Sequence, residues 1–198
     1  MKRAPLSAGI LLLLSVLSTV SVAQDSDLKA YTACNLGTDF QIVQVDGPVN
    51  DFSWPAPSRA GEVSIPVETG YRVLVTYRQD EPFGNLKVER IPEKEFVNVR
   101  ANLLNSFDYL SSEPGMDPKI RTQAFNGLTF YGVDRSKLEG GVLSTYALFR
   151  EDRNIVVSLY LLNAEPAERK FKTLEEYKAI RDKFLDAFSK CMAPAMPH

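Results

Sequence analysis

The sequence has almost no histidine: the single imidazole belongs to His198, the last of the 198 residues. Chain ends are usually poorly ordered, so we expect no histidine-based triad, no histidine zinc site and no histidine pH switch. Tryptophan occurs once and cysteine twice. The rest of the composition is ordinary, since 44% of the residues are hydrophobic and 24% are charged, which is typical of a globular chain.

Several familiar site motifs are also missing. The sequence contains no Walker A loop, no dinucleotide-binding glycine fingerprint, no EF-hand loop, no nucleophile elbow and no cluster with metal-ligand spacing. We therefore expect no cofactor and no metal. Acidic residues outnumber basic residues by 25 to 23, and no cluster of Lys and Arg overrides that balance. A nucleic-acid partner is accordingly not expected.

The first 23 residues have the pattern of a secretory signal peptide. Two basic residues precede an apolar run from Ala8 to Val22, and Ser21-Val22-Ala23 is a small-residue cleavage sequence. The run is interrupted by serine and threonine and is short for a spanning helix, which favours cleavage over a retained anchor. We expect residues 24–198 to form one globular domain, periplasmic or secreted, with no stable membrane span.

Cys34 and Cys191 are the only two cysteines in the sequence. In an oxidising compartment they are expected to form one disulfide that ties together two distant parts of the chain. In the chain-entropy model, closing a loop of this length stabilises the fold by about 5 kcal/mol. The alternative is two independent buried thiols.

Alternating apolar residues predict strands through most of the chain. We expect them at Phe40–Val45, Glu62–Val67, Tyr71–Tyr77, Leu86–Ile91, Ile120–Phe125, Leu128–Val133, Val142–Arg150 and Ile155–Leu162. The strands before residue 92 are expected to be half exposed. Asp46–Gly61 is rich in proline and predicts a loop, and Asn126-Gly127 predicts a type I′ turn.

Two amphipathic helices are expected as well. The first has an apolar stripe with helical spacing, made of Phe96, Val99, Leu103, Phe107 and Leu110. The second begins at a capping box of Thr173 and Glu176. Its expected buried stripe is Leu174, Tyr177, Ile180, Phe184, Phe188 and Cys191.

The strand Ile155–Leu162 is apolar on both faces, so both faces of its sheet need a cover. We therefore predict an α+β fold in which an antiparallel sheet of about six to seven strands is sandwiched between helices (α/β/α). The order of elements resembles the Mog1/PsbP-like fold, and Leu159–Phe188 is similar to the way those proteins end. The resemblance implies an accessory or binding role and transfers no site residue.

Two groups of aromatic residues are candidates for a functional site. Phe52 and Trp54 lie in the proline-rich loop, where they are a candidate partner contact or else fold back over one end of the core. Tyr131, Tyr146 and Tyr160 lie on neighbouring strands. They are a candidate pocket lining, and the alternative is a set of cross-strand pairs beneath a helix.

Charged residues offer a third candidate site. The last helix carries the carboxylates Glu175, Glu176, Asp182 and Asp186. Basic residues alternate with them, which predicts a solvated charged face that includes Lys178, Arg181, Lys183 and Lys190. A further basic group is expected to protect a strand edge, and it consists of Lys119, Arg121, Arg135 and Lys137.

These observations favour an exported, non-enzymatic accessory or binding protein of the cell envelope. It would bind an envelope protein or a small ligand. One alternative is a carboxylate-dependent hydrolase or isomerase. The other is a secreted enzyme inhibitor that uses the Phe52–Trp54 loop.

Overall fold

The computed structural model describes residues 28–49, 53–54, 63–64, 67–78, 81–139, 141–162 and 171–192. The expected signal peptide, Phe52 and His198 lie outside the described residues, and only the backbone of Trp54 is described. Within these ranges, no helix combines the length and the hydropathy needed to cross a membrane.

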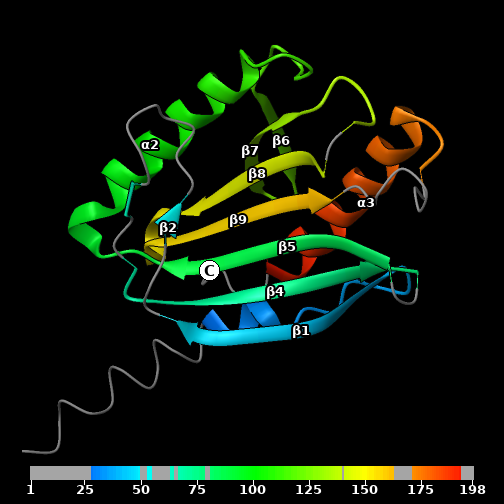
Figure 1. Cartoon of the computed structure of the whole chain (residues 1–198). Helices are drawn as coiled ribbons and strands as arrows, with labels where there is room; N and C mark the ends of the chain where they lie inside the picture. The colour runs from blue at the N-terminus through cyan, green and yellow to red at the C-terminus, as the bar shows by residue number, and fades with distance from the viewer. Residues whose placement is uncertain are drawn as a thin grey trace, which may run out of the picture.

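An antiparallel sheet dominates the fold (Figure 1). The strands are β1 (Phe40–Val49), β2 (Ser53–Trp54), β3 (Val63–Ser64), β4 (Thr69–Tyr77), β5 (Glu81–Arg90), β6 (Arg121–Phe125), β7 (Leu128–Asp134), β8 (Val142–Arg150) and β9 (Ile155–Leu162). The two long helices are α2 (Glu93–Ser111) and α3 (Leu174–Met192), and a short helix spans residues 28–32. Seven strands form the main sheet in the order β1-β4-β5-β9-β8-β7-β6, and β2 pairs with β3 separately. The predicted α+β class is confirmed.

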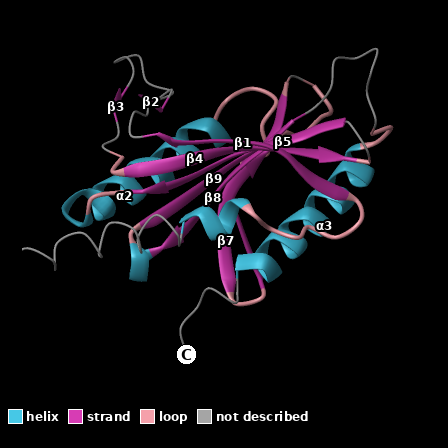
Figure 2. Ribbon diagram, turned by 90° about the horizontal axis from the view of Figure 1, so that it is seen from below, coloured by secondary structure: helices cyan, strands magenta, loops and turns pink. Residues whose placement is uncertain are grey.

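Helices cover the sheet on both faces, as the apolar pattern of β9 predicted. The residues of β9 that point to one side pack with α3 in the largest core cluster, and they are Ile155, Val157, Leu159 and Leu161. Val156, on the opposite side, packs in a second cluster with α2. Figure 2 shows the two helices on opposite sides of the sheet. We call the α3 side the inner face and the α2 side the outer face.

The cover of the outer face is uneven. The buried side chains of α2 pack on residues of β7, β8 and β9, with Phe107 against Val133 and Ala147. In Figure 1, α2 lies toward the β7–β9 part of the sheet, whereas β1 and β4 form the opposite end of the strand order. The outer face of β1, β4 and β5 carries mainly polar side chains, including Gln44, Asp46, Arg72, Asn85 and Lys87.

The predicted disulfide joins Cys34 to Cys191, with their Cα atoms 5.5 Å apart. It connects the segment after the 28–32 helix to the last turn of α3. The Asn126-Gly127 turn is confirmed too, since both residues have positive φ, 49° and 79°. The Asn126 side chain also donates a 2.7 Å hydrogen bond to Ser189 Oγ, which holds the β6–β7 hairpin against α3.

Several sequence expectations need correction. The predicted loop Asp46–Gly61 is partly strand, because β1 continues to Val49 and Ser53–Trp54 pairs with Val63–Ser64. β5 begins at Glu81 rather than Leu86, because β4 extends the ladder that pairs with it.

The capping box at the start of α3 is also altered. Thr173 Oγ1 accepts from the Glu176 amide, as expected, at 3.1 Å. The Glu176 carboxylate, however, accepts from the amide of Lys172 rather than from that of Thr173.

Candidate functional site

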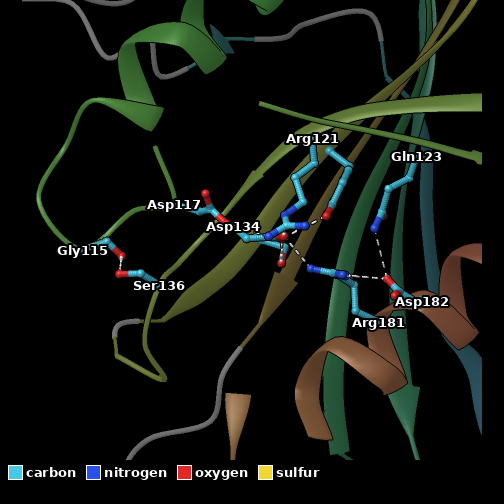
Figure 3. Close-up of polar contacts among 10 residues, drawn as sticks. Gly115, Asp117, Arg121, Gln123, Asp134, Ser136, Arg181 and Asp182 are labelled. Carbon is cyan, nitrogen blue, oxygen red and sulfur yellow. Dashed lines mark hydrogen bonds and ion pairs between the residues drawn. The ribbon is translucent and has the colours of Figure 1, made fainter. Parts of the chain in front are cut away.

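Among the described residues, a dense polar cluster lies on the inner face and is centred on Asp134, the last residue of β7 (Figure 3). The register places Asp134 directly opposite Ser144 on β8. Asp134 Oδ1 accepts from Ser144 Oγ at 2.6 Å and from Tyr146 at 3.0 Å. Asp134 Oδ2 accepts from Arg181 Nη1 at 2.5 Å and forms an ion pair with Arg121 Nε at 2.9 Å.

Further contacts extend this cluster toward the surface. Arg181 Nε donates to Asp182 Oδ1 at 2.8 Å, and Arg121 Nη2 donates to Asp117 Oδ2 at 2.6 Å. Tyr177 of α3 donates to Ser144 Oγ at 2.6 Å. Burial raises the pKa of this tyrosine well above its usual range, so the phenol remains a donor at neutral pH.

The Asp134 cluster fits a structural role. Both carboxylate oxygens are engaged by protein donors, whereas a general base needs a lone pair directed at a substrate. The cluster ties β7 and β8 to α3 by charge-assisted hydrogen bonds. Neither of the two hollows described below is lined by Asp134 or Arg181.

One basic residue of this cluster was assigned wrongly from the sequence. Arg181 was expected on a solvated face, yet only 2% of it is exposed. It lies four residues after Tyr177 and three before Phe184, so helical spacing places it within the buried stripe. Arg121 lies on β6, an edge strand of the main sheet, and forms ion pairs with Asp117 and Asp134.

The three candidate tyrosines do not line a common pocket. Tyr146 is fully buried on the inner face beside Asp134. Tyr131 lies on the outer face, with its ring centroid 5.9 Å from that of Phe149, and Tyr160 is also on the outer face, on β9. Successive residues of a strand point to opposite faces, and the observed register puts Tyr131 opposite Ala147 rather than Tyr146.

A hollow of about 470 Å³ opens on the outer face, and we call it the outer hollow. Its lining residues are Gln44, Asp46, Arg72, Val73, Leu74, Asn85, Leu86, Lys87, Val142, Tyr160 and Leu162. They come from β1, β4, β5, β8 and β9, so regular strands position most of the site. Of the candidate tyrosines, only Tyr160 belongs to it.

A row of polar side chains crosses the floor of the outer hollow. The strand register places Asp46 opposite Arg72, Arg72 opposite Lys87, and Lys87 opposite Ser158. Directly opposite residues share one face of an antiparallel pair, so the guanidinium and ammonium groups project from the same side. Lys87 Nζ lies 5.5 Å from the centre of the Tyr160 ring.

Burial perturbs the charges at this floor. Partial burial lowers the pKa of Lys87 to about 8, with Glu89 opposing the shift and Arg72 adding to it. Glu89, two residues further along β5, is only 4% exposed. Burial raises the pKa of Glu89 to about 7, against the opposing effects of Lys87 and Arg72. Gly70 makes room for this side chain, since a Cβ there would lie 2.9 Å from Glu89 Cγ.

A second hollow of about 320 Å³ lies at the other end of the outer face. It is lined by Arg100, Gly127, Leu128, Thr129, Tyr131, Leu148, Phe149, Arg150, Glu151 and Asp152. Arg150 forms two hydrogen bonds to the Asp152 carboxylate, at 3.1 and 3.0 Å. Arg100 Nε lies 3.4 Å from Glu151 Oε1. This hollow is the smaller of the two, and two cations of its lining are paired with acids of the same lining.

The outer hollow was missed at the sequence level. The strands before residue 92 were expected to be half exposed, but Glu89 on β5 is buried. Only the observed register of β4 with β5 places Arg72 opposite Lys87. Among the described residues, no group of three or more His, Cys, Asp or Glu side chains is placed to hold a metal ion.

Comparison of the chain with protein-family models, with curated proteins and with solved structures finds no match in any of the three.

Proposed function

We propose that this protein is a non-catalytic binding protein of the cell envelope that holds a small ligand in the outer hollow. The observation that carries the proposal is the outer hollow itself. It combines a pair of cations, Arg72 and Lys87, with an apolar wall on a rigid sheet. Its volume of about 470 Å³ falls within the range of small-molecule sites.

Export is part of the proposal. It is supported by the signal-peptide pattern of residues 1–23 and by the disulfide between Cys34 and Cys191, a cross-link typical of oxidising compartments. A Mog1/PsbP-like fold is proposed on the order of the elements, three main strands, a helix, four strands and a closing helix. That resemblance also supports an accessory rather than a catalytic role.

The arrangement of buried acids favours binding over hydrolysis. A carboxylate-dependent hydrolase needs two carboxyl groups flanking one bond of the substrate. Among the described residues, the buried acids are Glu89 and Asp134, which lie on opposite faces of the sheet. The inhibitor alternative depends on Phe52 and Trp54, and no observation on the described residues favours it.

The proposal is tested by thermal unfolding of the disulfide-intact protein with a chemically diverse panel of small molecules. Leu74→Arg places a long side chain in the hollow, and Val97→Arg, at a 74% exposed position on α2, is the matched control. We expect some compounds to raise the Tm of the wild type and of Val97→Arg, but not of Leu74→Arg. Stabilisation of none, or equal stabilisation of Leu74→Arg, overturns the proposal, as does turnover of a panel member that Leu74→Arg abolishes.

A further inference from the structure

We infer that the second hollow binds a single pyranose ring of a neutral saccharide. This hollow of about 320 Å³ lies where the start of β7 and the end of β8 meet α2, and it shares no lining residue with the outer hollow. The inference goes beyond the proposed function, because it concerns a separate site and a different class of ligand. It rests on the accessible hydroxyl groups of the lining, on the aromatic rings beside them and on the balance of charge.

Two hydroxyl groups on β7 project into the second hollow. Thr129 and Tyr131 are two residues apart on this strand, so both side chains lie on the outer face of the sheet, and both line the hollow. Among the described residues, neither hydroxyl has a hydrogen-bond partner in the protein, and neither is sealed from solvent. Because a hydroxyl group both donates and accepts, this pair can form hydrogen bonds with the hydroxyl groups of a ligand.

An aromatic surface lies beside these hydroxyl groups. The rings of Tyr131 and Phe149 have centroids 5.9 Å apart, and both pack on the outer-face core around Phe107. The guanidinium carbon of Arg100 lies 5.7 Å from the centre of the Phe149 ring. The faces of a pyranose ring carry C–H groups, which pack favourably on the electron-rich face of an aromatic ring. A sugar therefore matches both the hydroxyl groups and the rings of this lining.

The charges of the lining cancel. It contains two cations, Arg100 and Arg150, and two acids, Glu151 and Asp152. Arg150 donates two hydrogen bonds to Asp152, and Arg153, outside the lining, lies 3.6 Å from the same carboxylate. The side chains of the Arg100–Glu151 pair are more exposed. A charged ligand meets a like charge here whatever its sign, whereas guanidinium and carboxylate groups both form hydrogen bonds with the hydroxyl groups of a neutral sugar.

The inference is tested by NMR titration of the disulfide-intact protein, with the amide signals assigned. The neutral probes are glucose, galactose and mannose. The charged probes are the uronate and the amino sugar derived from each, and cyclohexanol is a ring with a single hydroxyl group. We expect at least one neutral sugar to shift the amide signals of residues 129–131 and 149–152, with a Kd of about 1–10 mM. Its uronate, its amino sugar and cyclohexanol should each bind about five-fold more weakly or worse.

Matched variants show where the sugar binds. Thr129→Val and Tyr131→Phe each remove one hydroxyl group and keep the shape of the side chain, so each should weaken binding of that sugar about three-fold or more. Tyr109→Phe removes the hydroxyl group of an exposed tyrosine outside the hollow and should leave binding unchanged. Leu74→Arg, in the outer hollow, should also leave it unchanged. Circular dichroism checks that each variant is folded.

A trisaccharide of the same sugar distinguishes two sources of the ring. Tighter binding of the trisaccharide assigns the site to a polysaccharide chain, equal binding assigns it to a free sugar, and both results support the inference.

The remaining outcomes overturn the inference. They are the absence of these amide shifts with every neutral sugar at about 100 mM, equal binding of a charged probe or cyclohexanol, and wild-type affinity in both Thr129→Val and Tyr131→Phe. Loss of binding in Leu74→Arg would place the sugar in the outer hollow and would overturn it as well. Failure of the sugars at the second hollow leaves the proposed function standing, because that function is tested at Leu74 with other compounds.

Discussion

Replacing Asp134 by Asn removes the negative charge at the centre of the inner-face cluster. The side chain is 1% exposed and Arg181 is 2% exposed, so the arginine loses its main counter-ion in a site that water does not reach. Removing one partner of a buried ion pair typically costs about 3–5 kcal/mol. Arg181 keeps a contact to Asp182, whose side chain is 44% exposed. We therefore expect Asp134→Asn to lower the free energy of unfolding by about 3 kcal/mol.

Urea denaturation followed by circular dichroism, with the disulfide intact, measures this loss. The matched control is Glu151→Gln, which removes the acid from a pair with 39% and 68% exposed side chains. It should cost less than about 1 kcal/mol. A double-mutant cycle of Asp134→Asn with Arg181→Met should give a coupling energy of about 1–3 kcal/mol. Equal effects of Asp134→Asn and Glu151→Gln, or a coupling near zero, would refute the structural role of the cluster.

Gly132→Ala should lower the free energy of unfolding by about 3 kcal/mol, because its Cβ would lie 2.3 Å from a backbone oxygen of β8. In the control Gly141→Ala, the added Cβ meets nothing within 4 Å, so the free energy of unfolding should change by less than about 0.5 kcal/mol. Similar urea midpoints for the two variants would contradict this prediction. Burial raises the pKa of Glu89 from 4.5 to about 7, so the folded state holds a proton that the unfolded state releases, and stability falls as pH rises through this window. Urea titrations at pH 5 and pH 8 should show the wild type losing up to about 3 kcal/mol relative to Glu89→Gln, and parallel pH profiles would exclude the effect. Replacing Cys34 and Cys191 together by serine should lower the free energy of unfolding by about 5 kcal/mol in the same assay, and reduction of the wild type should have the same effect. A loss below about 1 kcal/mol would show that the disulfide does not stabilise the fold.

Features that depend on short-range patterns were predictable from the sequence. The two apolar faces of Ile155–Leu162 required helices on both sides, and the sheet has them. Asn126-Gly127 indicated the hairpin turn through its tolerance of positive φ. The pairing of Cys34 with Cys191 followed from the presence of only two cysteines.

Features that depend on distant partners were not predictable. Arg181 on a helix looks the same in sequence whether it is solvated or bound to Asp134, which lies 47 positions earlier. The pairing of Arg72 with Lys87 depends on the register of the β4–β5 hairpin, which a β-bulge shifts between Val75 and Thr76. The outer hollow therefore required the observed register.

The position of β9 has a consequence for how the molecule is assembled. In the main sheet, β1, β4 and β5 are one run of neighbours and β6, β7 and β8 are another, and β9 is the strand that pairs with both. Each run can form from contacts between strands close in sequence, but the two runs become one sheet only after residues 155–162 have been synthesised and inserted between them. A substitution that weakens β9 therefore divides the protein into two partial sheets instead of fraying one edge.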